Sequence, residues 1–89
     1  WFYRDAIEAM LSVGDASGAL RYVTGLEEYT RAEPLPWADL FAARGRVLAL
    51  CLQGHADNAT RRELERVGEV LRDAGFKSYL VAVNAFLAA

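Results

Sequence analysis

The sequence predicts an all-α protein of the α-solenoid type, in which antiparallel helical hairpins stack side by side. Apolar residues recur at helical spacing in five stretches, and each stretch ends near a glycine or a proline. Two helix–turn–helix junctions, at Gly14 and Gly54, lie 40 residues apart, a period typical of helical repeats. We therefore expect one helical-repeat domain over residues 1–89, with hairpins at 1–33 and 36–75 and a capping helix at 76–89.

The first predicted hairpin joins helices at residues 1–13 and 16–31. Gly14 suits the position after a helix, because glycine adopts positive φ without steric cost. Asp15 is expected to cap the second helix with its carboxylate. The apolar side of the first helix is formed by Tyr3, Ile7 and Met10.

The third predicted helix begins at Pro36, where proline is favoured in the first turn, and ends near Gln53. It follows Glu33-Pro34-Leu35-Pro36, in which the prolines disfavour helix. Gly54 is expected to end this helix.

The fourth and fifth predicted helices span residues 59–74 and 76–88. Thr60 and Glu63 form a candidate capping box for the fourth helix, and Asp57 is a competing cap. Gly75 separates the two helices.

Small residues inside these helices predict close packing. Gly18 and Gly25 weaken the second helix, so they indicate either a close backbone approach or a loose segment. Ala42, Ala43 and Gly45 leave one side of the third helix small enough for a neighbouring helix to come near.

Composition excludes several classes of function. Of the 89 residues, 54% are apolar and 25% are charged, which is ordinary for one globular domain. The net charge of −2 gives no basic footprint for nucleic acid or for a membrane surface. No apolar run is long enough for a transmembrane helix. The single cysteine, Cys51, cannot form an intrachain disulfide and predicts a buried thiol in a reducing, cytoplasmic compartment.

The turn Gly14-Asp15-Ala16-Ser17-Gly18-Ala19-Leu20 resembles the Gly-Asp-x-x-x-Ala-apolar turn of tetratricopeptide repeats. In that family the glycine ends the first helix, and the alanine lets the second helix pack tightly on it. The second unit departs from the pattern, since it lacks an aspartate after Gly54 and has Glu63 and Arg66 at apolar positions. The resemblance therefore implies a degenerate repeat that is longer than the standard one.

Residues 1–50 are also similar to the C-terminal repeat region of large bacterial signalling proteins. These proteins combine a class III adenylate/guanylate cyclase domain, an ATPase module and degenerate tetratricopeptide repeats. The similarity is carried by the linker Tyr29-Thr30-Arg31-Ala32-Glu33-Pro34-Leu35-Pro36-Trp37. It implies a regulatory or partner-sensing role without catalysis in this segment, and the abrupt start at Trp1 suggests a piece of a longer protein.

Arg4 and Arg44 occupy matching positions of the two units, and with Glu8 they are the candidate binding residues. The resemblance implies that they line a concave groove, where arginines meet carboxylates of a bound segment. The alternative is that both arginines are solvated on helix surfaces.

The other candidate functional residues have simpler interpretations. His55 and Cys51 are too few for a metal site, and nothing near Cys51 predicts an activated nucleophile, so no metal or cofactor is expected. The aromatic residues Trp1, Phe2 and Tyr3 either pack the first helix or drive self-association.

The sequence thus predicts a non-catalytic module that binds a protein segment or another domain of its parent. One alternative is the end cap of a longer solenoid, with Lys77, Ser78 and Asn84 on an exposed outer face. The other alternative is a small helical domain of an unrecognised enzyme.

Overall fold

Five α-helices make up the computed structural model, which describes residues 2–32, 37–55 and 57–88. They are α1 (Phe2–Ser12), α2 (Ala16–Ala32), α3 (Ala38–Leu52), α4 (Asn58–Ala74) and α5 (Leu80–Ala88), with a 3₁₀ turn, η1 (Lys77–Tyr79), before α5. No strand occurs in these described ranges, and the predicted all-α class with five helices is confirmed.

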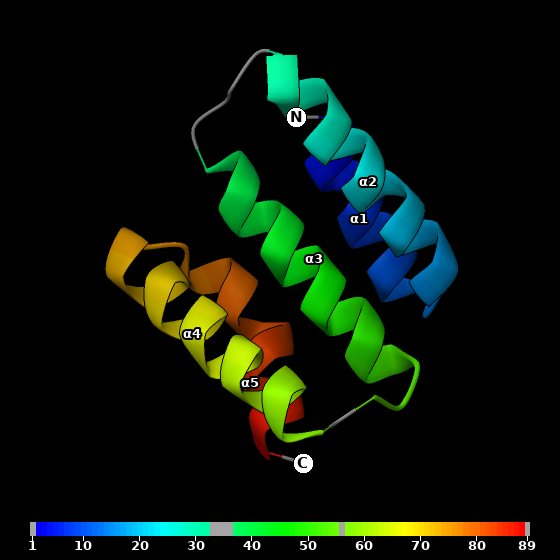
Figure 1. Cartoon of the computed structure of the whole chain (residues 1–89). Coiled ribbons are helices and arrows are strands. Elements are labelled where there is room, and N and C mark those ends of the chain that lie inside the picture. Colours follow the sequence, from blue (N-terminus) through cyan, green and yellow to red (C-terminus); the bar gives the residue numbers. More distant parts are fainter. Residues whose placement is uncertain (1, 33–36, 56, 89) are drawn as a thin grey trace.

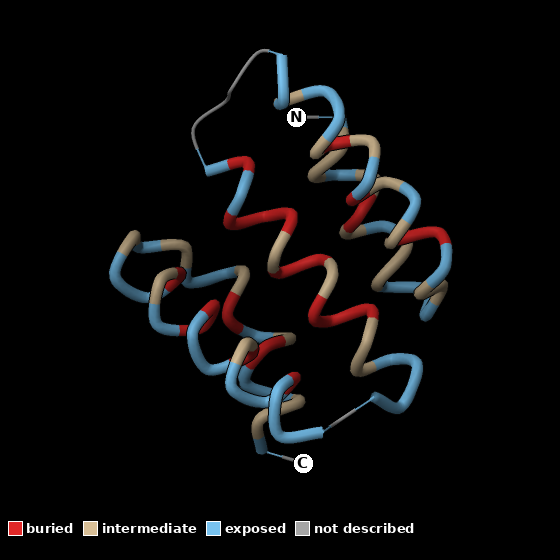
Figure 2. The backbone as a smooth tube through the Cα atoms, viewed as in Figure 1, coloured by how far each residue is buried: buried red, intermediate tan, exposed pale blue. Residues whose placement is uncertain are grey.

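The central helix of the fold is α3, which contacts each of the other four helices (Figure 1). Neighbours in sequence pack as pairs, and α3 also contacts α1 and α5. By contrast, α2 and α4 do not touch each other in the described part of the chain. Figure 2 shows buried residues recurring along the whole of α3, because neighbours cover most of its circumference.

Two apolar cores lie on either side of α3. One core joins α3 to α4 and α5, and its buried members are Leu40, Val47, Leu48, Leu64, Val67, Leu71, Leu80 and Val83. The other core joins α3 to α1 and α2, and its buried members are Ile7, Val23, Leu26, Ala38, Phe41 and Ala42. Three side chains pack against both cores, namely Leu11, Phe76 and Tyr79.

The two glycine turns form as predicted. Gly14 and Gly54 have φ of 77° and 84°, and the next backbone N–H in each turn donates back across the helix end. Asp15 N lies 2.8 Å from Met10 O, and His55 N lies 2.9 Å from Leu50 O. These bonds satisfy carbonyl groups that a helix end otherwise leaves without partners.

The caps of α2 and α4 are aspartates. Asp15 Oδ1 accepts from the backbone N–H of Gly18 at 2.8 Å, which confirms the predicted cap. Of the two candidates for α4, Asp57 is the one used, since its Oδ1 accepts from the backbone N–H of Thr60 at 2.8 Å. The helix therefore begins at Asn58, one residue earlier than predicted.

Two predicted helix starts are wrong. Pro36 lies outside the described residues, and α3 begins at Ala38 because Trp37 adopts a left-handed φ of 65°. The last helix begins at Leu80 rather than Phe76. Phe76 has a non-helical ψ of 61°, and its carbonyl accepts from Tyr79 N–H in a 3₁₀ turn.

Close helix packing explains the small residues. A Cβ atom added to Gly45 of α3 would lie 2.8 Å from Val23 Cγ2 and 2.9 Å from Ile7 Cγ2. A Cβ atom at Gly25 of α2 would lie 2.6 Å from the ring of Tyr3. The glycines in α2 therefore mark close approach, which was one of the two predicted explanations.

Candidate interaction site

The three predicted binding residues lie together on the surface formed by α1, α3 and η1. Arg44 of α3 forms an ion pair with Glu8 of α1. The guanidinium of Arg4 lies 5.8 Å from the ring centre of Phe41, and that ring lies 4.9 Å from the ring of Tyr79. Arg4 and Arg44 thus each lie against one ring of the contacting pair Phe41 and Tyr79.

Arg44 is not open to a ligand in the way the sequence suggested. Its side chain is only 3% exposed, whereas that of Glu8 is 38% exposed. Its Nε donates to the carbonyl of Tyr79 at 3.0 Å, and its guanidinium lies 5.1 Å from the centre of the Tyr79 ring. The carboxylate that Arg44 meets therefore belongs to its own chain, and a binding role for Arg4, Glu8 and Arg44 stays a prediction.

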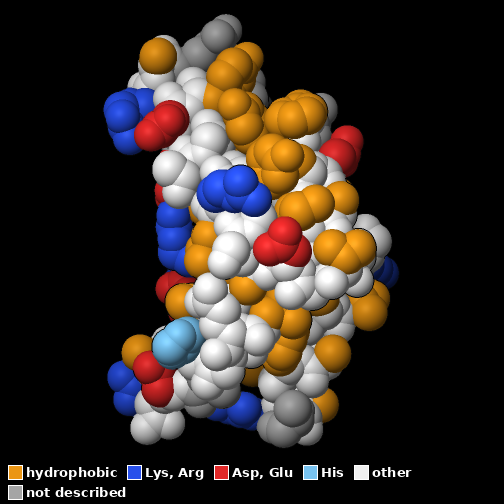
Figure 3. All heavy atoms as spheres, turned by 90° about the vertical axis from the view of Figure 1, so that its right-hand side faces the viewer, with side chains coloured by type: hydrophobic (Ala, Val, Ile, Leu, Met, Phe, Trp, Pro, Cys, Tyr) orange, Lys and Arg blue, Asp and Glu red, His pale blue; other side chains and the backbone are white. Residues whose placement is uncertain are grey.

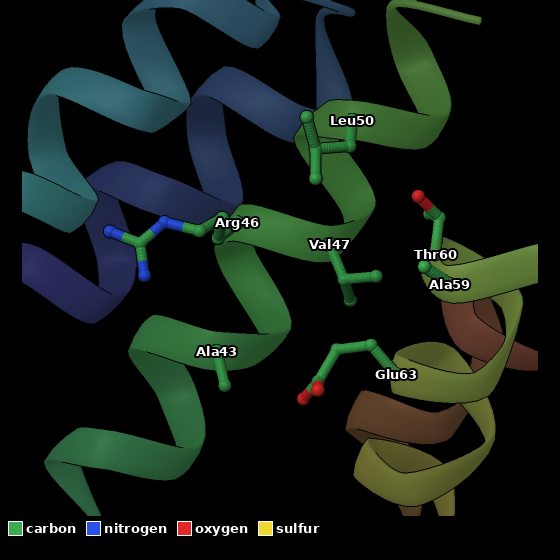
Figure 4. Close-up of a pocket in the computed structure, with 7 residues that line it drawn as sticks. All are labelled: Ala43, Arg46, Val47, Leu50, Ala59, Thr60 and Glu63. Carbon is green, nitrogen blue, oxygen red and sulfur yellow. The ribbon is translucent and has the colours of Figure 1, made fainter. Parts of the chain in front are cut away.

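A groove lies on another side of α3, where α4 packs beside it (Figure 4). Its volume is about 390 Å³, and both α3 and α4 contribute to its lining. Most of the lining is apolar or small: Ala43, Val47, Leu50 and Ala59, with the polar residues Arg46, Thr60 and Glu63. This size is within the range of ligand-binding clefts.

The charged groups at the groove are held by different partners. Figure 4 shows Glu63 extending from α4 toward Ala43, while Arg46 points away toward the first hairpin. Arg46 donates to both carboxylate oxygens of Glu27, at 2.9 and 2.5 Å. That hydrogen bonding lowers the pKa of Glu27 and raises the pKa of Arg46. Arg46, the basic residue that lines the groove, is thus directed to α2. The charge that faces the groove is the carboxylate of Glu63.

One carboxylate oxygen of Glu63, Oε1, already accepts hydrogen bonds. Both Nε and a terminal nitrogen of Arg66 donate to Oε1, and this contact raises the pKa of Arg66. A carboxylate offers about four acceptor positions on its two oxygens. Glu63 therefore has the capacity to accept a further donor at the mouth of the groove.

Sequence patterns did not reveal this groove. Of its lining residues, Ala43 was predicted only as a small residue that allows a neighbouring helix to come near. The ion pair between Glu27 and Arg46 joins two different helices, so no spacing rule within one helix detects it.

The residues considered for catalysis lie apart from the groove. His55 is exposed in the turn after α3, and Cys51 is a partly buried thiol whose pKa is raised by burial. The described residues contain no group of three or more His, Cys, Asp or Glu side chains placed to hold a metal ion. None of their helices is long and apolar enough to cross a membrane.

No protein-family model matches the sequence, and no curated protein or solved structure is significantly similar to it.

An apolar band runs over the first hairpin (Figure 3). Phe2 is 69% exposed, and its ring lies 5.3 Å from that of Tyr3 and 6.0 Å from that of Tyr22. Trp1, the remaining member of the aromatic start, lies outside the described residues. Of the two expectations for these residues, Tyr3 packs against the core, whereas Phe2 remains available for contact.

Proposed function

We propose that the chain is a non-catalytic interaction module that holds an amphipathic helix of a protein partner in the groove between α3 and α4. The observation that carries this proposal is the apolar floor over α3 with the Glu63 carboxylate at its mouth. An amphipathic helix binds such a groove through apolar residues spaced three and four apart.

The chemistry of the groove favours a helix that carries a basic residue beside its apolar stripe. Apolar side chains of the helix would cover the partly exposed Ala43 and Leu50, which removes apolar surface from water. A lysine or arginine has an aliphatic stem that packs on such a surface while its charged end reaches a carboxylate. Glu63 has the acceptor capacity to receive it.

The biological context of the proposal is a regulatory repeat region of a larger bacterial signalling protein. Support comes from the tetratricopeptide-like turn, whose Gly14 and Asp15 have the turn and cap roles that the resemblance implies. The fully buried Ala19 supports the tight packing expected of the same motif. The partner helix would then belong to another protein or to another domain of a cyclase-like parent chain.

The end-cap alternative has one observation in its favour. Lys77, Ser78 and Asn84 are exposed, as that hypothesis requires. However, Val81 on the same helix is 72% exposed, and terminal caps of solenoids need a polar outer face. We therefore place the interaction role ahead of the capping role.

A selection for helical peptides tests the proposed groove. A displayed library of amphipathic helices is panned against the chain, and the binding site of each selected peptide is mapped by amide chemical shifts. We expect peptides with a basic residue beside an apolar stripe, and we expect their shifts to cluster at Ala43, Leu50 and Ala59.

Two matched pairs of variants sharpen this test. Ala59→Arg places a bulky cation in the groove and should abolish binding, whereas Ala9→Arg on the exposed side of α1 should not change it. Glu63→Gln should weaken the binding of basic peptides more than Glu65→Gln does, because Glu65 is an exposed carboxylate of the same helix that does not line the groove. Peptides that bind equally to all four variants, or that map to another surface, would refute the proposal.

A further inference from the structure

Arg44 connects three segments that are far apart in the sequence. Its guanidinium pairs with Glu8 of α1, and its Nε donates to the backbone carbonyl of Tyr79 in η1. The same guanidinium lies over the Tyr79 ring. One side chain of the central helix therefore holds both the first helix and the turn that begins α5.

The contact with η1 depends on how the guanidinium is oriented. Arg44 is almost fully buried, so its charge has little access to water and relies on Glu8. Because the guanidinium is planar and its donors have a fixed geometry, holding one nitrogen on Glu8 also fixes the direction of Nε. The carbonyl of Tyr79 accepts in that direction.

We propose that Glu8 and Arg44 form an ion pair through which α1 controls the local stability of η1 and α5. In the described residues α1 and α5 do not contact each other, so an effect of Glu8 on α5 has to pass through Arg44 or the shared core. Glu8 is the more exposed member of the pair, and a basic group of another molecule would reach the ion pair there.

The variant Glu8→Gln imitates a carboxylate whose charge has been taken by such a group, and it keeps the size of the side chain. We expect amide hydrogen exchange in η1 and α5 to accelerate by about tenfold to a hundredfold, the factor for losing one hydrogen bond to a charged group. The NMR signal of the Arg44 Nε–H should lose its protection at the same time. Exchange in α2 should change much less.

The control is Glu27→Gln, which alters another ion pair between helices without touching Arg44. It should leave exchange in α5 at the wild-type rate. A second variant, Arg44→Lys, keeps a positive charge near Glu8 but removes the Nε donor, and it should loosen η1 and α5 while retaining the helical fold.

Unchanged exchange in α5 of the Glu8→Gln variant would overturn the inference. Acceleration by the same factor in every helix would also overturn it, because that result indicates a general loss of stability rather than a coupling. Loosening of α5 by Glu27→Gln to the same extent would refute the special role of Arg44.

Discussion

At Gly45 the helix α3 packs closely against both α1 and α2, and adding one methyl group there tests this packing. In Gly45→Ala, the new Cβ would lie 2.8 Å from Val23 of α2 and 2.9 Å from Ile7 of α1. Both neighbours are buried β-branched residues of the same core, so neither has free space into which to turn. We expect α3 to be pushed away from the first hairpin.

The magnitude follows from two opposing effects. Alanine is favoured over glycine inside a helix by about 0.8–1.0 kcal/mol. Overpacking a core typically costs about 1–3 kcal/mol. Gly68→Ala in α4 provides the control, since its Cβ would meet Val83 at 3.3 Å, a contact that a slight shift relieves. The helix preference is common to both variants, so Gly45→Ala should be less stable than Gly68→Ala by about 1–3 kcal/mol.

Chemical denaturation followed by circular dichroism measures this difference, with thermal unfolding as a second assay. For a domain of this size, each kcal/mol corresponds to a shift of about 4–8 °C in Tm. If Gly45→Ala is as stable as Gly68→Ala, or more stable, the close approach of α3 to the first hairpin is wrong.

Three further predictions concern single contacts. Ala19→Leu should destabilise the domain by about 1–3 kcal/mol in chemical denaturation, because this fully buried alanine has no room for a larger side chain; unchanged stability would show that the first hairpin does not close there. Arg46→Met should lower the free energy of unfolding by less than about 1 kcal/mol, because the side chains of Arg46 and Glu27 are 43% and 40% exposed. A larger loss of stability that persists in high salt would contradict this. The backbone N–H of Thr60 lowers the pKa of Asp57, so the folded state binds that proton more weakly than the unfolded state. The resulting stability is present above about pH 4 and is lost as the pH falls through the folded pKa, and Asp57→Asn should remove this part of the pH dependence of unfolding.

Local signals in the sequence were sufficient for most helix ends. Glycine at positive φ and an aspartate as first cap act within one turn of the chain, so Gly14, Asp15 and Gly54 were predicted correctly. The start of α5 was not predictable in this way. Phe76 leaves the helical conformation where its ring packs against those of Trp37 and Phe41, at 5.4 and 5.3 Å, and these residues are distant in sequence.

The candidate groove was beyond the sequence for a related reason. Its existence depends on how α4 packs on α3. Helical periodicity identifies the face that a helix buries, but it does not determine the distance and angle at which two helices pack. The sequence therefore described Glu63 only as a member of a candidate capping box and as a polar residue at an expected apolar position.

Arg4 and Arg44, which lie 40 residues apart in the sequence, have different surroundings in the fold. Both arginines lie against an aromatic ring of the following unit, Phe41 for Arg4 and Tyr79 for Arg44. Arg4 is 28% exposed and Arg44 is 3% exposed. The difference arises because α3 has described helices on both sides, so that Glu8 approaches from one side and η1 from the other. The burial of each arginine thus depends on its neighbours in the fold, and a sequence offset alone does not predict the accessibility of the charge.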